Sequence, residues 1–174
     1  MSFQKVLVAL DRSLQASTVF EQALSEVKAR SNGSLMLVHA LRMDAEVPTG
    51  AFMGIGTVAD VYTYGTLKRV QQEKVQQGRD KAIAWLQTYQ QEAIAQGIPT
   101  EITCLVGTPG IGICQLAQSW GANLVVLGRR GHQGMTEVMM GSVSNYVVHH
   151  APCSVLVVQG VMETAEANSL EPVS

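Results

Sequence analysis

A glycine-rich stretch in the second half of the chain contains residues whose types and spacing suit phosphate binding. The stretch from Gly128 to Asn145 reads GRRGHQGMTEVMMGSVSN, holds four glycines and two serines, and directly follows the apolar run LVVL. Glycine lets backbone N–H groups approach an anion, so glycine-rich turns between a strand and a helix often hold phosphates. Plain connections also use glycine and serine. The stretch is therefore a candidate phosphate loop, with a ligand-free connection as the alternative.

The end of this stretch predicts the start of a helix at Gly141-Ser142. The free N–H groups and the positive dipole end of a helix favour a phosphate there by about 0.3 to 1 kcal/mol from the dipole alone. Ser142 and Ser144 add hydroxyl donors. The intervening loop also carries Arg129, Arg130 and His132. These side chains either meet outer phosphates or are simply solvated, because adjacent arginines on a loop often contact only water.

Three common classes of nucleotide site are excluded by missing motifs. The chain contains no GxxxxGK[ST], so it lacks the lysine that P-loop enzymes place on the outer phosphates, and no GxGxxG fingerprint of dinucleotide binders. After the first apolar run it reads ALDRSLQAS, which is not the Ser/Thr-rich phosphate loop of flavodoxins. Adenylating enzymes of similar fold are disfavoured in addition to these three classes, because their SGGxDS loop is missing.

Short apolar runs alternate with helical stretches along the chain, which predicts an α/β domain. The expected strands are residues 5–10, 34–40, 101–106, 122–128 and 153–158, and the expected helices are 14–30, 66–96, 110–120 and 142–149. The runs lack strict alternation, as in parallel strands covered by helices on both faces. On the second helix we expect a polar first half in solvent and a packed second half. The packed face is Ile83, Leu86, Ala93 and Ile94.

Asp11 and Gly128 each come just after a predicted strand. In doubly wound sheets ligands bind beyond the carboxyl ends of the strands, where the strand order reverses. If the first and fourth strands are neighbours there, Asp11 and Gly128 face one crevice. Asp11 is alternatively a cap of the first helix. We expect His39, at the end of a buried strand, to be a hydrogen-bonded core histidine rather than a catalyst.

Length, charge and composition limit the remaining possibilities. A chain of 174 residues with 47% hydrophobic residues can fill one core, so a single domain over residues 1–160 is expected. The net charge of -2 and the lack of basic runs argue against nucleic acid as a partner. No apolar run suits a membrane span and the N-terminus lacks a signal-peptide pattern, which predicts a cytoplasmic protein. Cys104, Cys114 and Cys153 are expected to be reduced thiols.

Two segments lie outside the alternating pattern. Residues 42–65 form an unusually long, glycine-rich connection, and connections of that length in compact domains are often functional. Residues 161–174 are acidic with little that can pack, so we expect a disordered tail.

The glycines follow the spacing Gly128-x2-Gly131-x9-Gly141-Ser142. This resembles the G-x2-G-x9-G-[ST] signature of the ATP-binding branch of the universal stress protein family. The resemblance extends to VLVALD, LMLVHA, VGTPGIGI and GSVSNYVVHHAPCSVLVV, and so covers nearly the whole chain. It implies a Rossmann-like open five-stranded parallel sheet of order 3-2-1-4-5, with helices on both faces.

The resemblance also implies where a nucleotide would lie. Adenine would meet the backbone near Ala40, with Ala9 and Asp11 beside the base and ribose, and Asp11 is the candidate ligand of Mg²⁺. The ribose and phosphate side would be lined by Leu127, Gly128, Arg129 and Gly131. The phosphates would be held by Gly141, Ser142, Val143 and Ser144. The chain departs from the family pattern in having Ala9 where proline is common, and in the length of the 42–65 connection.

Family resemblance and sheet-edge physics together predict a function and an assembly. The last strand, 153–158, would be an apolar edge of the sheet, and pairing with a second copy of the chain would cover it. The resemblance implies the same assembly, because universal stress proteins form homodimers through antiparallel contact of their last strands. We therefore expect an ATP-binding regulatory homodimer in the stress response, with ADP and AMP as alternative ligands. A slow ATPase is one alternative, because only soft donors, two arginines and one carboxylate are available. An interaction adaptor with a vestigial nucleotide site is the other.

Overall fold

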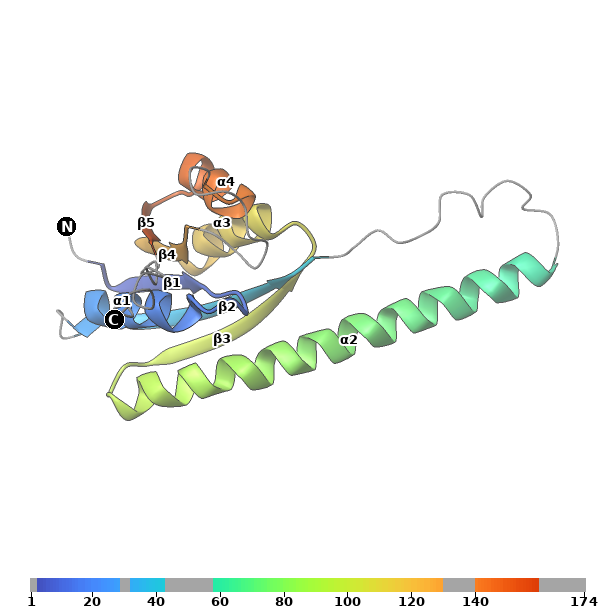
Figure 1. Ribbon diagram of the computed structural model, residues 1–174, viewed down its shortest axis with the longest axis horizontal. Helices are drawn as coiled ribbons and strands as arrows, with labels where there is room; N and C mark the ends of the chain where they lie inside the picture. Colours follow the sequence, from blue (N-terminus) through green and yellow to red (C-terminus); the bar gives the residue numbers. More distant parts are fainter. Residues whose placement is uncertain (1–2, 29–31, 43–57, 130–139, 160–174) are drawn as a thin grey trace, which may run out of the picture.

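The computed structural model describes residues 3–28, 32–42, 58–129 and 140–159, with the side chains of residues 58–65 and 67 left out. Strands and helices alternate along the chain as the sequence predicts (Figure 1). The strands are β1 (Lys5–Ala9), β2 (Ser34–Leu41), β3 (Thr100–Val106), β4 (Leu124–Gly128) and β5 (Ser154–Val158). The helices are α1 (Ala16–Lys28), α2 (Val58–Ala95), α3 (Pro109–Trp120) and α4 (Ser142–His150).

The five strands form one sheet in the order β3-β2-β1-β4-β5. All four pairings are parallel, and Val8 of β1 is level with Leu37 of β2 on one side and with Val126 of β4 on the other. The predicted α/β fold and strand order are therefore confirmed. The near-continuous apolar runs of β1 and β4 are explained by this topology, because both strands lie inside the sheet and are covered on both faces.

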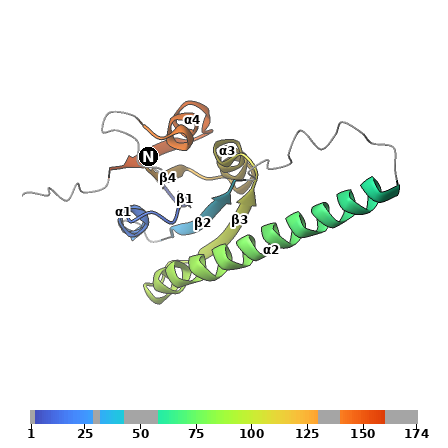
Figure 2. The same cartoon turned by 45° about the vertical axis from the view of Figure 1, so that its right-hand side comes forward.

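The helices cover the two faces of the sheet in pairs (Figures 1 and 2). On one face, Val6 and Val8 pack with Phe20 of α1 and Leu86 of α2. On the other, Leu7 packs with residues of α3 and α4 such as Ile113 and Val147. Neighbouring residues of β1 enter opposite cores because successive side chains of a strand point to opposite faces.

Helix α1 buries the stripe that its sequence predicts. Its buried residues are Ala16, Val19, Phe20, Ala23, Leu24 and Val27. The 3.6-residue periodicity was sufficient to predict the buried face of α1, because this helix packs on the sheet along its whole length. Residues 29–31, where the helix was expected to continue, lie outside the described residues.

Helix α2 differs from the prediction in its start and in the exposure of one residue of its last turn. It begins at Val58, so residues 58–65 are helical rather than part of a 42–65 loop, while residues 43–57 lie outside the described residues. Leu86 and Ala93 are buried as predicted, but Ile94 is 54% exposed. Ile94 belongs to the last turn, on a side that the sheet does not cover. Helical periodicity alone does not reveal how much of the circumference of a helix its packing partner covers.

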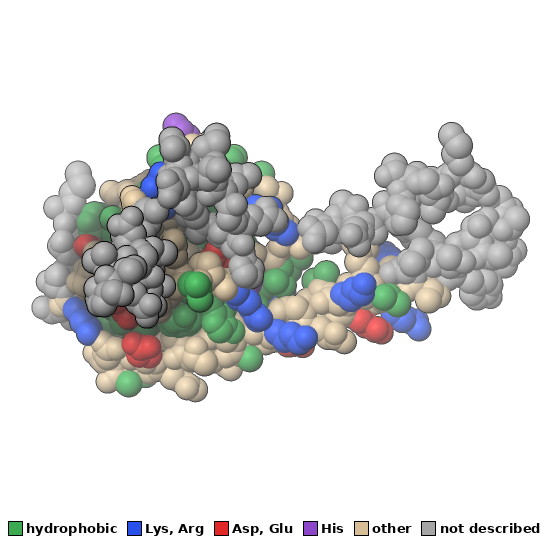
Figure 3. Space-filling model, in the orientation of Figure 1, with side chains coloured by type: hydrophobic (Ala, Val, Ile, Leu, Met, Phe, Trp, Pro, Cys, Tyr) green, Lys and Arg blue, Asp and Glu red, His purple; other side chains and the backbone are tan. Residues whose placement is uncertain are grey.

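The first half of α2 extends well beyond the sheet (Figures 1 and 2). Lys, Arg, Asp and Glu side chains are spread along the part of this arm seen in Figure 3, with isolated hydrophobic side chains such as the exposed Val70 among the residues of the arm. Gly78 marks the approach to the sheet, since a Cβ at this position would lie 3.3 Å from Leu41 Cδ1. Although α2 has 38 residues, none of the helices in the described ranges has an apolar stretch that could cross a membrane.

The three cysteines are free thiols, as predicted. Burial raises the pKa of each thiol, and the neighbouring Cys114 raises that of Cys153 further. The thiols are therefore mostly protonated near neutral pH and suit packing better than nucleophilic chemistry.

Candidate functional site

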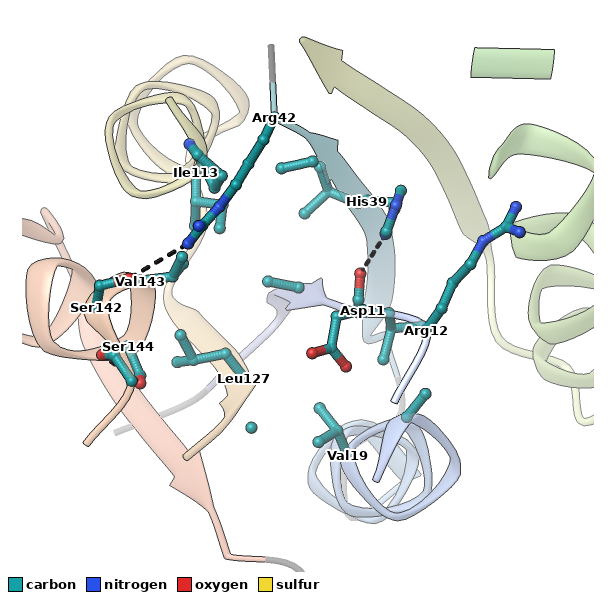
Figure 4. Close-up of a pocket in the computed structure, with 18 residues that line it drawn as sticks. Asp11, Arg12, Val19, His39, Arg42, Ile113, Leu127, Ser142, Val143 and Ser144 are labelled. Atoms are coloured by element: carbon teal, nitrogen blue, oxygen red, sulfur yellow. Dashed lines mark hydrogen bonds between the residues drawn. The ribbon is translucent and has the colours of Figure 1, made fainter. Parts of the chain in front are cut away.

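A cavity of about 390 Å³ opens at the carboxyl ends of β1, β2 and β4 (Figure 4). This is where the order of the sheet reverses, because β2 and β4 lie on opposite sides of β1. Its volume is in the range of small-molecule sites. The lining residues come from both helical layers: Ala9, Leu10, Asp11, Arg12, Ala16, Val19, Val38, His39, Ala40, Arg42, Pro109, Ile113, Leu127, Gly128, Gly141, Ser142, Val143 and Ser144.

The structure brings most of the predicted site residues together around this cavity. Those that line it are Ala9, Asp11, Ala40, Leu127, Gly128, Gly141, Ser142, Val143 and Ser144. Arg129 follows β4 but is not among the lining residues. Gly131, together with Arg130 and His132, lies outside the described residues. The structure thus describes the two ends of the glycine-rich stretch, and both ends line the cavity, at Gly128 and at Gly141.

The first turn of α4 presents backbone donors to the cavity. Gly141 precedes the helix with φ -61° and ψ 153°, and no side chain caps this end. The first bond of the helix runs from the Asn145 N–H to the Gly141 carbonyl, at 2.9 Å. The N–H groups of Ser142, Val143 and Ser144 therefore have no acceptor within the helix, and they can bind an anion together with the positive dipole end.

The hydroxyl of Ser144 has a different role from the one expected for it. Its side chain is only 2% exposed, and Oγ lies 2.8 Å from the Arg129 carbonyl and 3.0 Å from the Gly141 carbonyl. A hydroxyl has one hydrogen to donate, and here it is donated to the backbone. The Ser144 hydroxyl therefore holds the two ends of the glycine-rich stretch together instead of pointing to a ligand.

Two backbone bonds complete this attachment. The Gly141 N–H donates to the Arg129 carbonyl at 2.9 Å, and the Arg129 N–H donates to the Val158 carbonyl at 2.8 Å. The start of α4 is thereby tied to the ends of β4 and β5. Its donors are fixed in place before any ligand arrives, which lowers the cost of binding.

Asp11 does not cap α1, because that helix begins only at Ala16. Instead its Oδ1 accepts hydrogen bonds from both the backbone N–H and the hydroxyl of Ser13, which forms a local turn. The carboxylate lies on the β1 side of the cavity, between Leu127 and Val19 (Figure 4). Within the described part of the chain, no group of three His, Cys, Asp or Glu residues could hold a metal ion.

His39 and Arg12 support the wall of the cavity next to α2. His39 Nδ1 lies 2.8 Å from the Leu10 carbonyl and therefore donates to it, which agrees with the predicted hydrogen-bonded histidine. Its ring meets Trp85 edge to face at 5.5 Å. Arg12 donates to the Lys81 carbonyl at 2.9 Å and covers the Trp85 ring, so its charge points away from the cavity (Figure 4).

Arg42 crosses the rim of the cavity. It follows β2, and its Nη2 donates to the Ser142 hydroxyl oxygen of α4 at 3.3 Å (Figure 4). Sequence reasoning missed this residue because it assigned Arg42 to the long connection. Sequence reasoning also missed Pro109 and Ile113 of α3. The local sequence at the start of a helix does not indicate which cavity the helix borders.

Comparison with known proteins gives one consistent result. The model of the universal stress protein family matches residues 2–159. A universal stress protein of Synechocystis is 37% identical over 161 residues, which are 91% of this chain and 99% of that protein. A solved universal stress protein in complex with cAMP has a TM-score of 0.61 at 22% identity, over 91% of this chain and 98% of that one. A family member from Arabidopsis thaliana with AMP bound has a TM-score of 0.58 at 18% identity, over 95% and 97%.

Proposed function

Because the chain belongs to the universal stress protein family, we propose that its cavity binds an adenine nucleotide, ATP above all, and that the protein acts as a nucleotide-dependent regulator in the stress response. The observation that carries this proposal is the position of the cavity. It lies at the switch point of the sheet and receives the first turn of α4. Two proteins of similar fold are described with AMP and with cAMP, which supports an adenine nucleotide as the ligand.

The lining residues suit the parts of such a ligand. Apolar side chains of Val38 and Ile113 would contact a flat base beside the backbone of Ala40, and Val19 lines the cavity near Asp11. Asp11 would accept hydrogen bonds from ribose hydroxyls. The first turn of α4 would bind phosphate. Gly131 belongs to the signature, and its contact with the ligand is part of the proposal.

Magnesium fits the site only in combination with a nucleotide. Mg²⁺ is commonly held by one or two carboxylates together with substrate phosphates and water. Asp11 is the one carboxylate among the described lining residues, so it would contribute a single ligand. Slow hydrolysis of ATP is the second candidate function, and the single carboxylate among the described lining residues supports no more than a low rate.

The third candidate, an adaptor with a vestigial site, is disfavoured by the glycine signature. Each of its positions, Gly128, Gly131, Gly141 and Ser142, is present. Loss of a glycine would be expected in a protein that no longer binds phosphate, because a side chain would then block the approach of the backbone.

The test is thermal unfolding of nucleotide-free protein with ATP, ADP, AMP and GTP, each with and without magnesium. A ligand at 100 times its dissociation constant adds about 2.7 kcal/mol of stability, which raises the Tm of a domain of this size by roughly 5 to 10 °C. We expect this shift with adenine nucleotides and none with GTP. No shift with any nucleotide would overturn the proposal in favour of the adaptor.

Gly141→Val is the matched variant for this experiment. Because φ of Gly141 is -61°, valine can take up its backbone conformation. The variant should fold and lose the shift with ATP, since a branched side chain stands where phosphate would lie. Retention of ATP binding by the folded variant would show that the phosphate is bound elsewhere.

A further inference from the structure

Arg42 places a cation at the end of the cavity where the donors of α4 are gathered. The residue directly follows β2, whereas its hydrogen-bond partner Ser142 is the first residue of α4, 100 positions away in the sequence. The side chain therefore spans the cavity rim between two elements that the fold alone brings together (Figure 4). Its guanidinium ends beside the first turn of α4, next to the free N–H groups described above.

The other charged groups of the cavity do not occupy this position. Arg12 is the other cation among the described lining residues, and it is engaged with the Lys81 carbonyl and the Trp85 ring of α2. Asp11 lies across the cavity on the β1 side and accepts from Ser13. His39 donates to the Leu10 carbonyl. Among the described lining residues, Arg42 is thus the cation that faces the α4 terminus.

The present partner of Arg42 is a weak one. A neutral hydroxyl accepts at 3.3 Å, which is beyond the usual range for a strong N–H···O bond. A phosphate oxygen in the same place would accept a shorter, charge-assisted bond. The Ser142 hydroxyl would then be able to donate its own hydrogen to the phosphate.

We propose that Arg42 is a phosphate-binding residue of this chain, which makes the cavity select phosphorylated nucleotides over the free nucleoside. The inference rests on the proposed function, because it specifies how the same cavity recognises its ligand. It goes beyond the glycine signature, which does not include Arg42. It also assigns the selection to a side chain reaching over from β2, in addition to the backbone of α4.

The experiment is titration calorimetry of the full chain with ATP and with adenosine. Arg42→Gln removes the charge at the cavity, and Arg69→Gln removes the same charge from an exposed site on the projecting half of α2. We expect Arg42→Gln to weaken ATP binding by about 10-fold, the low end for a hydrogen bond to a charged group because Arg42 is exposed. Adenosine affinity should stay unchanged in both variants, and ATP affinity should stay unchanged in Arg69→Gln.

Salt dependence gives a second readout that does not rely on adenosine. The ATP affinity of wild-type protein should fall more steeply with added KCl than that of Arg42→Gln, because salt screens the guanidinium and phosphate charges. Arg42→Lys should lie between wild type and Arg42→Gln, since lysine keeps the charge but lacks the planar fork.

Equal ATP affinity of wild type and Arg42→Gln would overturn the inference and leave the proposed function standing. An equal loss for ATP and adenosine would also overturn it, because Arg42 would then support the cavity as a whole. Absence of ATP binding by wild-type protein would instead refute the proposed function, and the inference with it.

Discussion

At the residue scale, the start of α4 is held by side-chain and backbone bonds that do not involve a ligand. Ser144 is the central residue, since its hydroxyl lies between the carbonyls of Arg129 and Gly141. The sequence shows a serine at the fourth position of GSVS but not the direction in which its hydroxyl points. The difference is functional: Ser142 is exposed at the rim, whereas Ser144 is a positioning residue beneath it.

Ser144→Ala should therefore destabilise the fold. It removes a buried hydrogen bond, so the loss should be about 1 kcal/mol, or roughly 2 to 4 °C in Tm. The matched control is Ser25→Ala, which removes an exposed hydroxyl bonded to the Gln22 carbonyl of α1 and should change stability by less than about 0.5 kcal/mol. Thermal unfolding of the two variants without ligand makes the comparison. Equal melting temperatures would contradict the assigned role of Ser144.

At the scale of elements, α3 and α4 approach each other closely through a glycine. Gly110 is buried, and a Cβ there would lie 2.8 Å from Tyr146 Cδ1 and 3.0 Å from Tyr146 Cβ. The ring of Tyr146 is in turn stacked on His150 at 4.0 Å, which leaves it little freedom to move. The position of α4, and with it the position of its donors at the cavity, thus depends on the absence of a side chain at residue 110.

Gly110→Ala should push the two helices apart and lower stability by about 1 to 3 kcal/mol, as overpacking commonly does. Gly112→Ala is the control in the same helix. Its Cβ would meet Leu105 Cδ1 at 3.1 Å, the end of a flexible side chain. The gain in helix propensity, up to about 1 kcal/mol, offsets that contact. Urea unfolding of both variants measures the difference, and a Gly110→Ala protein as stable as Gly112→Ala would rule out the close approach.

At the scale of the whole molecule, β5 is the outer strand of the sheet next to β4. Val155, Leu156 and Val157 are only partly buried in the single chain. An apolar edge of this kind invites pairing with another strand. The homodimer through residues 153–158 therefore remains our prediction for the assembly.

Sedimentation equilibrium at micromolar concentration should give the mass of a dimer. Val155→Arg should shift the protein toward the monomer, because a charge at the edge opposes strand pairing. Val148→Arg, on the exposed side of α4 at 43% exposure, is the matched control and should remain dimeric. A monomeric wild-type protein would refute the prediction.

The sequence by itself determined the alternation of elements and the buried stripe of α1, and it placed Asp11 and Gly128 each just after a strand. These are consequences of local periodicity and of the rule that parallel strands end at one edge. Turn and capping residues act over a few positions, and they also located most ends of the helices and strands to within two residues. The strand order came from family resemblance, and the tertiary structure confirmed it.

Only the tertiary structure decided which side chains meet across the fold. The bond from Arg42 to Ser142, the inward turn of the Ser144 hydroxyl and the α3 wall of the cavity join residues that are distant in sequence or have no local signature. The exposure of Ile94 likewise depends on which side of the last turn of α2 the sheet covers, and no sequence pattern indicated that α2 begins as early as Val58. Local patterns specify which face of an element is apolar, whereas the packing of several elements specifies what that face and its polar neighbours contact.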